Sequence, residues 1–158
     1  FLIEKATELG VKVIQPVVTE RTERSHFKAD RTERILRAAV KQTKRANKPW
    51  LRMATTGASQ KGMSDEVSTL RAALAEAVQE KCSLLLLHEL ASPEFDLRNI
   101  VDRLSDTPIA IAIGPEGGFS EEEVRMAREE FGAAIASLGP RRLRAETAAI
   151  AALAVVIR

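Results

Sequence analysis

The chain has 158 residues, which is enough for one domain that buries a hydrophobic core without a disulfide or a metal staple. Its single cysteine, Cys82, excludes an internal disulfide and is typical of a reducing, cytoplasmic setting. No apolar run reaches the roughly 20 residues that cross a bilayer, and the first residues lack the pattern of a signal peptide. We therefore expect a soluble protein.

The net charge of +2 conceals an uneven distribution of charge along the chain. Residues 21–52 hold 11 Lys or Arg against 3 acids, whereas residues 53–139 hold 7 against 15. A basic stretch of this kind is typical of a surface that contacts nucleic-acid phosphates, but a solvated surface helix has the same composition. Charge alone leaves both interpretations open.

The first third of the chain predicts a helix, a strand and a basic helix in that order. The opening helix ends near Leu9 and Gly10, and an apolar strand follows over residues 11–18. Asp30 and Glu33 can cap a helix that runs to about Ala46. Its inner stripe is Leu36, Ala39, Val40 and Thr43, while Arg31, Arg34, Lys41 and Arg45 lie towards its other faces.

The rest of the chain predicts alternating strands and helices. After a short extended piece over residues 51–55 come a helix over residues 69–79 and a fully buried strand over residues 84–87. A short helix over residues 97–104 and a second buried strand over residues 109–113 follow. Cys82 lies at the edge of an apolar run and is expected to fill the core. The pattern indicates an α/β fold with a mainly parallel sheet flanked by helices.

A glycine-rich loop follows the strand that we predict over residues 109–113. Residues 113–120 read Ile-Gly-Pro-Glu-Gly-Gly-Phe-Ser, and Ser120 with Glu123 forms a capping box for the next helix. Glycines between a buried strand and a helix N-terminus let a ligand approach the backbone. The spacing matches neither a P-loop nor a dinucleotide-binding fingerprint, and the acidic first turn favours a neutral or cationic ligand. A tight turn without any ligand is the alternative.

A second loop of the same kind covers residues 138–148, which read Leu-Gly-Pro-Arg-Arg-Leu-Arg-Ala-Glu-Thr-Ala. It follows the strand-like run over residues 133–138 and precedes the apolar helix over residues 148–157. Three arginines at the head of such an apolar helix are unusual, although a solvated basic turn would also explain them. Two loops of this type suggest that they form one shared pocket.

Together these two loops resemble those of the SPOUT class of methyltransferases, and specifically the RsmE-type family that methylates N3 of a uridine in 16S ribosomal RNA. Residues 5–11, Lys-Ala-Thr-Glu-Leu-Gly-Val, also resemble that family, as do Pro16 and Thr19-Glu20-Arg21. Gln42 and Arg45 resemble its Glu-Gln-x-x-Arg helix. Lys41 replaces the usual acid, and Ala145 replaces a common Thr. The resemblance covers essentially the whole chain.

The resemblance implies a fold, a cofactor and partners. It implies a deep trefoil knot near the C-terminus, a homodimer with the last helix near the partner, no metal, and a PUA-like RNA-binding barrel that would precede this domain and is missing from residues 1–158. It also implies methyl transfer from S-adenosylmethionine to 16S rRNA of the small ribosomal subunit. The cofactor-binding residues implied in this way are Leu87, His88, Glu89, Gly114, Pro115, Glu116, Gly117, Gly118, Leu138, Gly139, Arg142, Leu143 and Thr147. For His88, a strand-end residue held by a hydrogen bond is an equal alternative.

The resemblance also implies roles for charged residues. We expect Arg144 to stabilise negative charge on the uracil or a phosphate, and Glu116 or Glu146 to contact the cofactor or the base. The sequence leaves open which of them accepts the N3 proton. RNA-binding candidates are Arg21, Arg24, Gln42 and Arg45. Two alternatives are another SPOUT enzyme, such as a transfer RNA ribose 2′-O methyltransferase, and a non-catalytic RNA-binding module.

Overall fold

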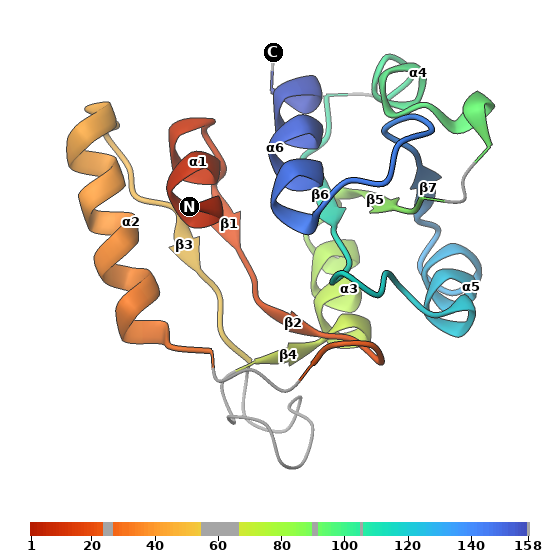
Figure 1. The fold of residues 1–158 in the computed structure, drawn as a ribbon, viewed down its shortest axis with the longest axis horizontal. Coiled ribbons are helices and arrows are strands. Elements are labelled where there is room, and N and C mark those ends of the chain that lie inside the picture. The colour runs from red at the N-terminus through yellow and green to blue at the C-terminus, as the bar shows by residue number, and fades with distance from the viewer. Residues whose placement is uncertain (24–26, 55–66, 90–91, 105, 158) are drawn as a thin grey trace.

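A computed structural model describes residues 1–158 except residues 24–26, 55–66, 90–91, 105 and 158, and it has the α/β architecture that the sequence predicts (Figure 1). The helices are α1 (Leu2–Glu8), α2 (Ala29–Thr43), α3 (Leu70–Gln79), α4 (Leu97–Val101), α5 (Glu121–Glu129) and α6 (Ala145–Val156), with a short 3-10 helix at Pro93–Phe95. The strands are β1 (Val13–Ile14), β2 (Val17–Val18), β3 (Trp50–Leu51), β4 (Ser68–Thr69), β5 (Ser83–Leu87), β6 (Ile109–Ala112) and β7 (Ala134–Ala136). All the strand pairs that the structure describes are parallel.

The C-terminal half, which comprises α3 and everything after it, is built around β5, which lies between β6 and β7 in one sheet. The N-terminal half is everything before α3. Successive side chains of a strand point to opposite faces. Leu84 and Leu86 therefore pack on one side with α3 and α5, while Leu85 packs on the other with α4 and α6. These three leucines are at most 6% exposed. The run of leucines thus makes β5 the buried centre of two core layers, as the sequence predicts.

β6 is less buried than the sequence predicts. Its residues Ile109–Ala112 are all half-buried, whereas the apolar run predicts a fully buried strand. Within the described sheet β6 pairs only with β5, so it is an edge strand with a neighbour on one side. It also ends at Ala112, which leaves Ile113 to begin the glycine loop.

The single strand that we predict over residues 11–18 is two short strands in the structure. β1 pairs with β3 and β2 pairs with β4, so each belongs to a different small sheet. Gln15 and Pro16 separate them, and proline has no N–H to donate to a ladder. The Gln15 side chain instead donates to Ser68 Oγ at 3.3 Å and to Glu76 Oε2 at 3.0 Å.

The basic helix, α2, begins and ends differently from the prediction. Its N-cap is Lys28 and no side chain caps it; Asp30 lies inside the first turn and Glu33 pairs with Lys48 at 2.6 Å. It ends at Thr43, before the predicted Ala46, because Lys44 takes up a left-handed conformation. Its buried residues are Thr32, Leu36 and Ala39; Val40 and Thr43 are half-buried.

The other helix predictions are largely confirmed. α1 ends at Glu8, and Thr69 caps α3 by accepting a hydrogen bond from Ala72 N at 3.2 Å. α4 ends at Val101 rather than Leu104, because Arg103 N and Leu104 N bond to carbonyls three residues back and tighten the last turn.

Three further expectations concern the chain as a whole. Cys82 packs against the core cluster, and burial raises the pKa of its thiol, which fits a filler residue. Among the residues that the structure describes, no helix combines the length and apolarity that crossing a membrane requires. The trefoil knot stays a prediction of the resemblance.

Candidate functional site

The glycine loop that joins β6 to α5 is held in one conformation by its own contacts. Gly118 has φ +67°, a left-handed backbone that favours glycine, and its N–H donates to Pro115 O at 2.8 Å. A Cβ on Gly114 would lie 3.2 Å from the backbone of Gly118, so the loop folds tightly on itself. Phe119 is 2% exposed and anchors the loop in the core. The predicted capping box is confirmed.

The N-terminal half reaches this loop through residues 19–22. Arg21 donates from Nη1 to Gly117 O at 2.9 Å, and Glu20 N donates to Glu123 Oε1 at 2.9 Å. Glu123 uses its other oxygen for Ser120 N at 3.0 Å, so one carboxylate joins the capping box to the N-terminal half. A Cβ on Gly117 would lie 3.3 Å from Arg21 Cβ. Gly117 therefore makes room for the side chain of Arg21.

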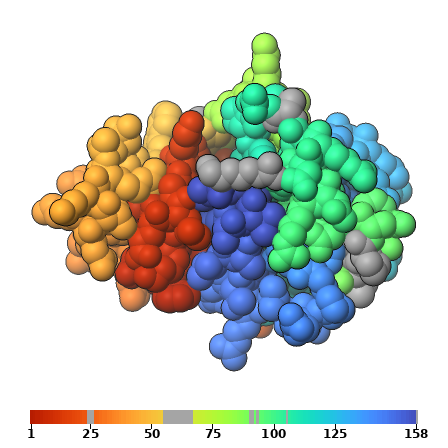
Figure 2. Space-filling model, turned by 90° about the horizontal axis from the view of Figure 1, so that it is seen from above, coloured from red at the N-terminus to blue at the C-terminus, as the bar shows by residue number. Residues whose placement is uncertain are grey.

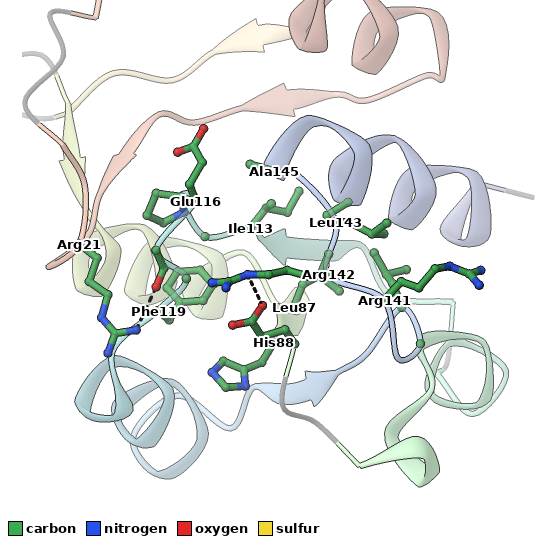
Figure 3. Close-up of a pocket in the computed structure, with 18 residues that line it drawn as sticks. Arg21, Leu87, His88, Ile113, Glu116, Phe119, Arg141, Arg142, Leu143 and Ala145 are labelled. Atoms are coloured by element: carbon green, nitrogen blue, oxygen red, sulfur yellow. Dashed lines mark hydrogen bonds and ion pairs between the residues drawn. The ribbon is translucent and has the colours of Figure 1, made fainter.

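The loop that follows β7 is tied to the end of β5. Arg142 Nε lies 2.9 Å from Glu89 Oε2, which comes just after β5. Gly139, with φ +100°, donates its N–H to the buried Ser137 Oγ at 3.1 Å. In Figure 3, Arg142 extends across the pocket towards Glu89, whereas Arg141 extends the opposite way. The two neighbouring arginine side chains therefore lie in different surroundings.

The loops after β5, β6 and β7 come together in one pocket (Figure 3). The three strands are parallel, so their carboxyl ends meet at one edge of the sheet, where open α/β sheets bind ligands. The shared pocket suggested by the sequence is therefore present. The predicted cofactor residues that line it are Leu87, His88, Glu89, Gly114, Pro115, Glu116, Gly117, Gly118, Leu138, Gly139, Arg142 and Leu143.

The residues expected to act in catalysis lie in different places. Glu116 lines the pocket. Arg144 is the N-cap of α6, and both Arg144 and Glu146 are exposed and absent from the pocket lining. Thr147, which the resemblance assigns to the cofactor, is likewise exposed and outside the lining. Ala145 and its helical neighbour three residues on, Ala148, line the pocket instead, so the first turn of α6 turns its small residues inward.

The three RNA-binding candidates that the structure describes have different surroundings. Arg21 lines the pocket, while Gln42 is exposed on α2. Arg45 donates to the carbonyls of Thr7 at 2.6 Å and Val11 at 3.3 Å, so its guanidinium joins the end of α2 to the end of α1. Arg24 lies outside the described residues.

Sequence reasoning missed several residues of the pocket. Arg21 was expected to hold RNA phosphates, but it also contacts the glycine loop, ninety-six positions away. No local pattern reveals such a contact. The small residues at the start of α6 could have been found from their i, i+3 spacing. The other lining residues outside the predicted set are Ile113, Phe119 and Arg141.

The charges around the pocket are mixed. Arg21, Arg141 and Arg142 line it together with Glu89 and Glu116, and Glu89 is paired with Arg142. In the described part of the chain, no group of three or more His, Cys, Asp or Glu residues could hold a metal ion. The pocket therefore offers backbone groups, apolar side chains and both signs of charge to a ligand.

These features define a class: an α/β protein with parallel strands and a ligand pocket made from glycine loops at the carboxyl edge of its sheet. Comparison with known proteins narrows the class. The RNA methyltransferase domain family matches residues 1–157. The chain belongs to this family, and within it the chain is similar to ribosomal RNA small subunit methyltransferase E.

The relatives agree with this membership. The chain is 29% identical over 155 residues to "Ribosomal RNA small subunit methyltransferase E" of Rickettsia conorii, with 98% of this chain and 57% of the relative covered. It is 34% identical over 157 residues to the protein of the same name from Synechocystis, with 97% and 46% covered. The chain thus spans about half the length of the curated relatives that it matches.

Solved structures show the same architecture. The Neisseria gonorrhoeae ribosomal RNA small subunit methyltransferase E bound to S-adenosyl methionine superposes with a TM-score of 0.76 at 31% identity, covering 98% of this chain and 57% of that chain. A Legionella pneumophila structure in complex with the cofactor SAM gives a TM-score of 0.74 at 32% identity, covering 98% and 58%.

Proposed function

We propose that this domain transfers a methyl group from S-adenosylmethionine to N3 of a uridine in the 16S rRNA of the small ribosomal subunit. The observation that carries the proposal is the pocket where the loops after β5, β6 and β7 meet, in a chain of the RNA methyltransferase domain family. Relatives named for the small ribosomal subunit support the substrate, and solved relatives with bound S-adenosylmethionine support the cofactor.

The residue types of the pocket fit that cofactor. Leu87, Ile113 and Leu138 offer apolar surface for an adenine ring, and the glycine loop offers backbone groups for hydrogen bonds. Carboxylates such as Glu116 suit a positively charged sulfonium and ammonium, and the guanidinium of Arg142 suits a carboxylate. When bound, S-adenosylmethionine supplies an activated methyl group, so the protein contributes mainly position.

The acceptor nitrogen needs help from the protein, because a uracil N3–H is a weakly acidic imide. Its proton must leave, or the developing anion must be stabilised, as the new bond forms. Glu116 lines the pocket and Glu146 does not, which favours Glu116 for the contact with cofactor or base. N3 lies on the pairing edge of the base, so the target uridine must be unpaired or extruded.

Arg144 is proposed to stabilise negative charge on the uracil or on a nearby phosphate. It is exposed and sits directly beside the pocket-lining Leu143 and Ala145. Arg144→Ala should therefore reduce turnover much more than it weakens S-adenosylmethionine binding. Steady-state kinetics with titration calorimetry separate the two effects, and normal turnover would remove Arg144 from this role.

A homodimer is part of the proposal. α6 is almost entirely apolar, yet only Ala149 and Ala152 are buried, while Ala154 is exposed and Ile157 just beyond the helix is 41% exposed. A second copy covering part of α6 would remove this apolar surface from water. Light scattering tests the dimer, and a monomer at micromolar concentration would count against it.

A ribosomal substrate would also place the enzyme in the cytoplasm.

The decisive experiment has two stages. Calorimetric titration with S-adenosylmethionine, with ATP and NAD as controls, should give saturable binding of the methyl donor alone. Incubation with small ribosomal subunits that lack the modification should then give N3-methyluridine, identified by nucleoside mass spectrometry. A ribose-methylated product would point to another methyltransferase activity. Binding of RNA without methyl transfer would point to a non-catalytic module.

A further inference from the structure

The outer face of α2 carries four exposed cations: Arg31, Arg34, Lys41 and Lys44. We call this set the α2 basic face. The first three lie within α2, and Lys44 is its C-cap. Leu36 and Ala39 are the buried positions of the same helix, and α1 packs against it. Within the described part of the chain, none of the four cations forms an ion pair or a side-chain hydrogen bond.

Other cations in the basic stretch have partners inside the protein. Arg45 donates to backbone carbonyls at the end of α1, and Arg21 donates to Gly117 O. Lys48 pairs with Glu33 at 2.6 Å, and Arg52 pairs with Glu80 at 2.6 Å. Among the described residues, the basic stretch therefore contains cations that bond within the fold, such as these four, and the α2 basic face, whose four cations do not.

The cations of the α2 basic face repel one another, although Lys41 and Lys44 lie at the C-terminal end of α2, where the helix dipole favours positive charge. Arg31 and Arg34 are three residues apart, as are Lys41 and Lys44, and like charges at this spacing repel. Glu33, an acid that could offset them, is already occupied by Lys48, with Arg37 at 3.9 Å. An external anion would relieve this repulsion.

We propose that the α2 basic face is a second RNA-contacting surface, which holds backbone phosphates of the RNA whose uridine enters the pocket. From Arg31 to Lys44 the helix rises about 20 Å, which is long enough to follow several phosphates of one strand. The exposed face has no large apolar side chain to insert into a membrane, because the apolar residues of α2 are turned inward. The choice of RNA as the partner rests on the proposed function.

The position of α2 suits contact at a distance from the reacting base. None of its residues lines the pocket. Figures 1 and 2 show α2 at one end of the molecule, with α1 between it and α6 and with α4 beyond α6. An RNA that delivers a base to the pocket and also reaches α2 must extend across α1 or the neighbouring strands. The α2 basic face would thus orient the RNA around the target.

The test compares two double variants of the full chain. Arg34→Gln with Lys41→Gln removes two cations of the α2 basic face, and Gln keeps the helix because its helix propensity is close to that of Arg and Lys. Arg98→Gln with Arg103→Gln is the matched control: it removes two exposed cations at and just beyond α4, at the other end of the molecule. Each pair changes the net charge equally.

Affinity for a small-subunit rRNA fragment that contains the target uridine is measured against salt concentration. The α2 double variant should bind roughly tenfold or more weakly at low salt, and the slope of log K against log salt should fall by about 1.5, since each lost phosphate contact removes about 0.7–0.9. The control should bind like the parent chain. S-adenosylmethionine affinity and turnover at saturating RNA should be unchanged in both.

The outcomes separate this inference from the proposed function. Equal affinity and slope for the α2 double variant and the control would overturn the α2 basic face as an RNA site, while continued methylation would leave the proposed function intact. Loss of RNA affinity in the α2 double variant alone would support the surface even if the parent chain did not methylate the fragment. In that case only the proposed reaction would fail.

Discussion

The two halves of the molecule use the same kinds of element in different ways. In the C-terminal half, β5 is buried between two strands and two layers of helices, and surface cations such as Arg71 and Arg125 pair with acids. In the N-terminal half the described strands are two residues long, and Trp50 on β3 is 68% exposed. Here the cations of the α2 basic face have no ion-pair partner among the residues that the structure describes.

This difference suggests that the C-terminal half provides a rigid pocket, while the N-terminal half provides a charged surface for recognition. A pocket needs walls that keep their place, and loops at the ends of buried parallel strands provide them. A surface that grips a flexible polyanion needs free charge more than a deep core. Residues 19–22 connect the two halves directly at the glycine loop. The following predictions test whether this division is real, from the largest effect to the smallest.

Shortening a buried side chain of the central strand, β5, should have the largest effect on stability. Leu86 is fully buried in the cluster that contains Leu74, Phe119 and Met126. Leu86→Ala should lower the free energy of unfolding by about 2–5 kcal/mol, because it leaves a cavity. Val13→Ala on β1, where Val13 is 37% exposed, should cost only about 0.5 kcal/mol. Urea unfolding followed by circular dichroism measures both, and equal losses would contradict the division into halves.

Backbone strain introduced into the glycine loop should weaken the binding of S-adenosylmethionine. Gly118→Val puts a β-branched residue at φ +67°, which costs of order 1–3 kcal/mol although no atom lies within 4 Å of the new Cβ. We expect S-adenosylmethionine to bind about tenfold more weakly, measured by calorimetry. Gly132→Val is the matched control, because Gly132 has φ +68°, equally open space and no place in the pocket. If both variants bind the cofactor normally, the loop is not part of its site.

Removal of the link between the halves should have an intermediate effect. Arg21→Ala deletes the hydrogen bond to Gly117 O, and a bond of this kind contributes about 0.5–1.5 kcal/mol. Affinity for S-adenosylmethionine should fall by about two- to tenfold, and Arg21→Lys should restore part of it. Arg31→Ala, on the α2 basic face, should leave the affinity unchanged. An unchanged affinity in Arg21→Ala would mean that the N-terminal half does not support the pocket.

An exposed pair in the C-terminal half should have the smallest effect. Arg71 Nη2 lies 3.0 Å from Glu130 Oε1 and lowers the pKa of the Glu130 carboxyl. A lowered pKa in the folded state adds stability above the unfolded value, near 4.3, and that stability is lost as the pH falls through the folded value. The small difference in stability between the parent chain and Arg71→Gln should therefore shrink between pH 7 and pH 3. It should also shrink at high salt. A difference that grows on acidification would contradict this assignment.

The sequence alone determined the features that depend on local pattern. The leucine run of β5, the capping box at Ser120 and both glycine loops could be predicted, because strand burial, helix capping and turns are encoded by neighbouring residues. The resemblance of those loops to a known family then gave most of the pocket residues. The predicted helix boundary was wrong where the backbone conformation of one residue decided it: the left-handed Lys44 ends α2 before the predicted Ala46.

Only the tertiary structure decided which partner each charged side chain has. Arg45 and Arg34 belong to the same basic stretch, yet Arg45 holds the end of α1 while Arg34 stays exposed. Arg21 meets the glycine loop, and the first turn of α6 directs Ala145 rather than Glu146 into the pocket. The physical reason is that long, flexible side chains find their partners through the packing of distant segments, which no pattern along the chain records.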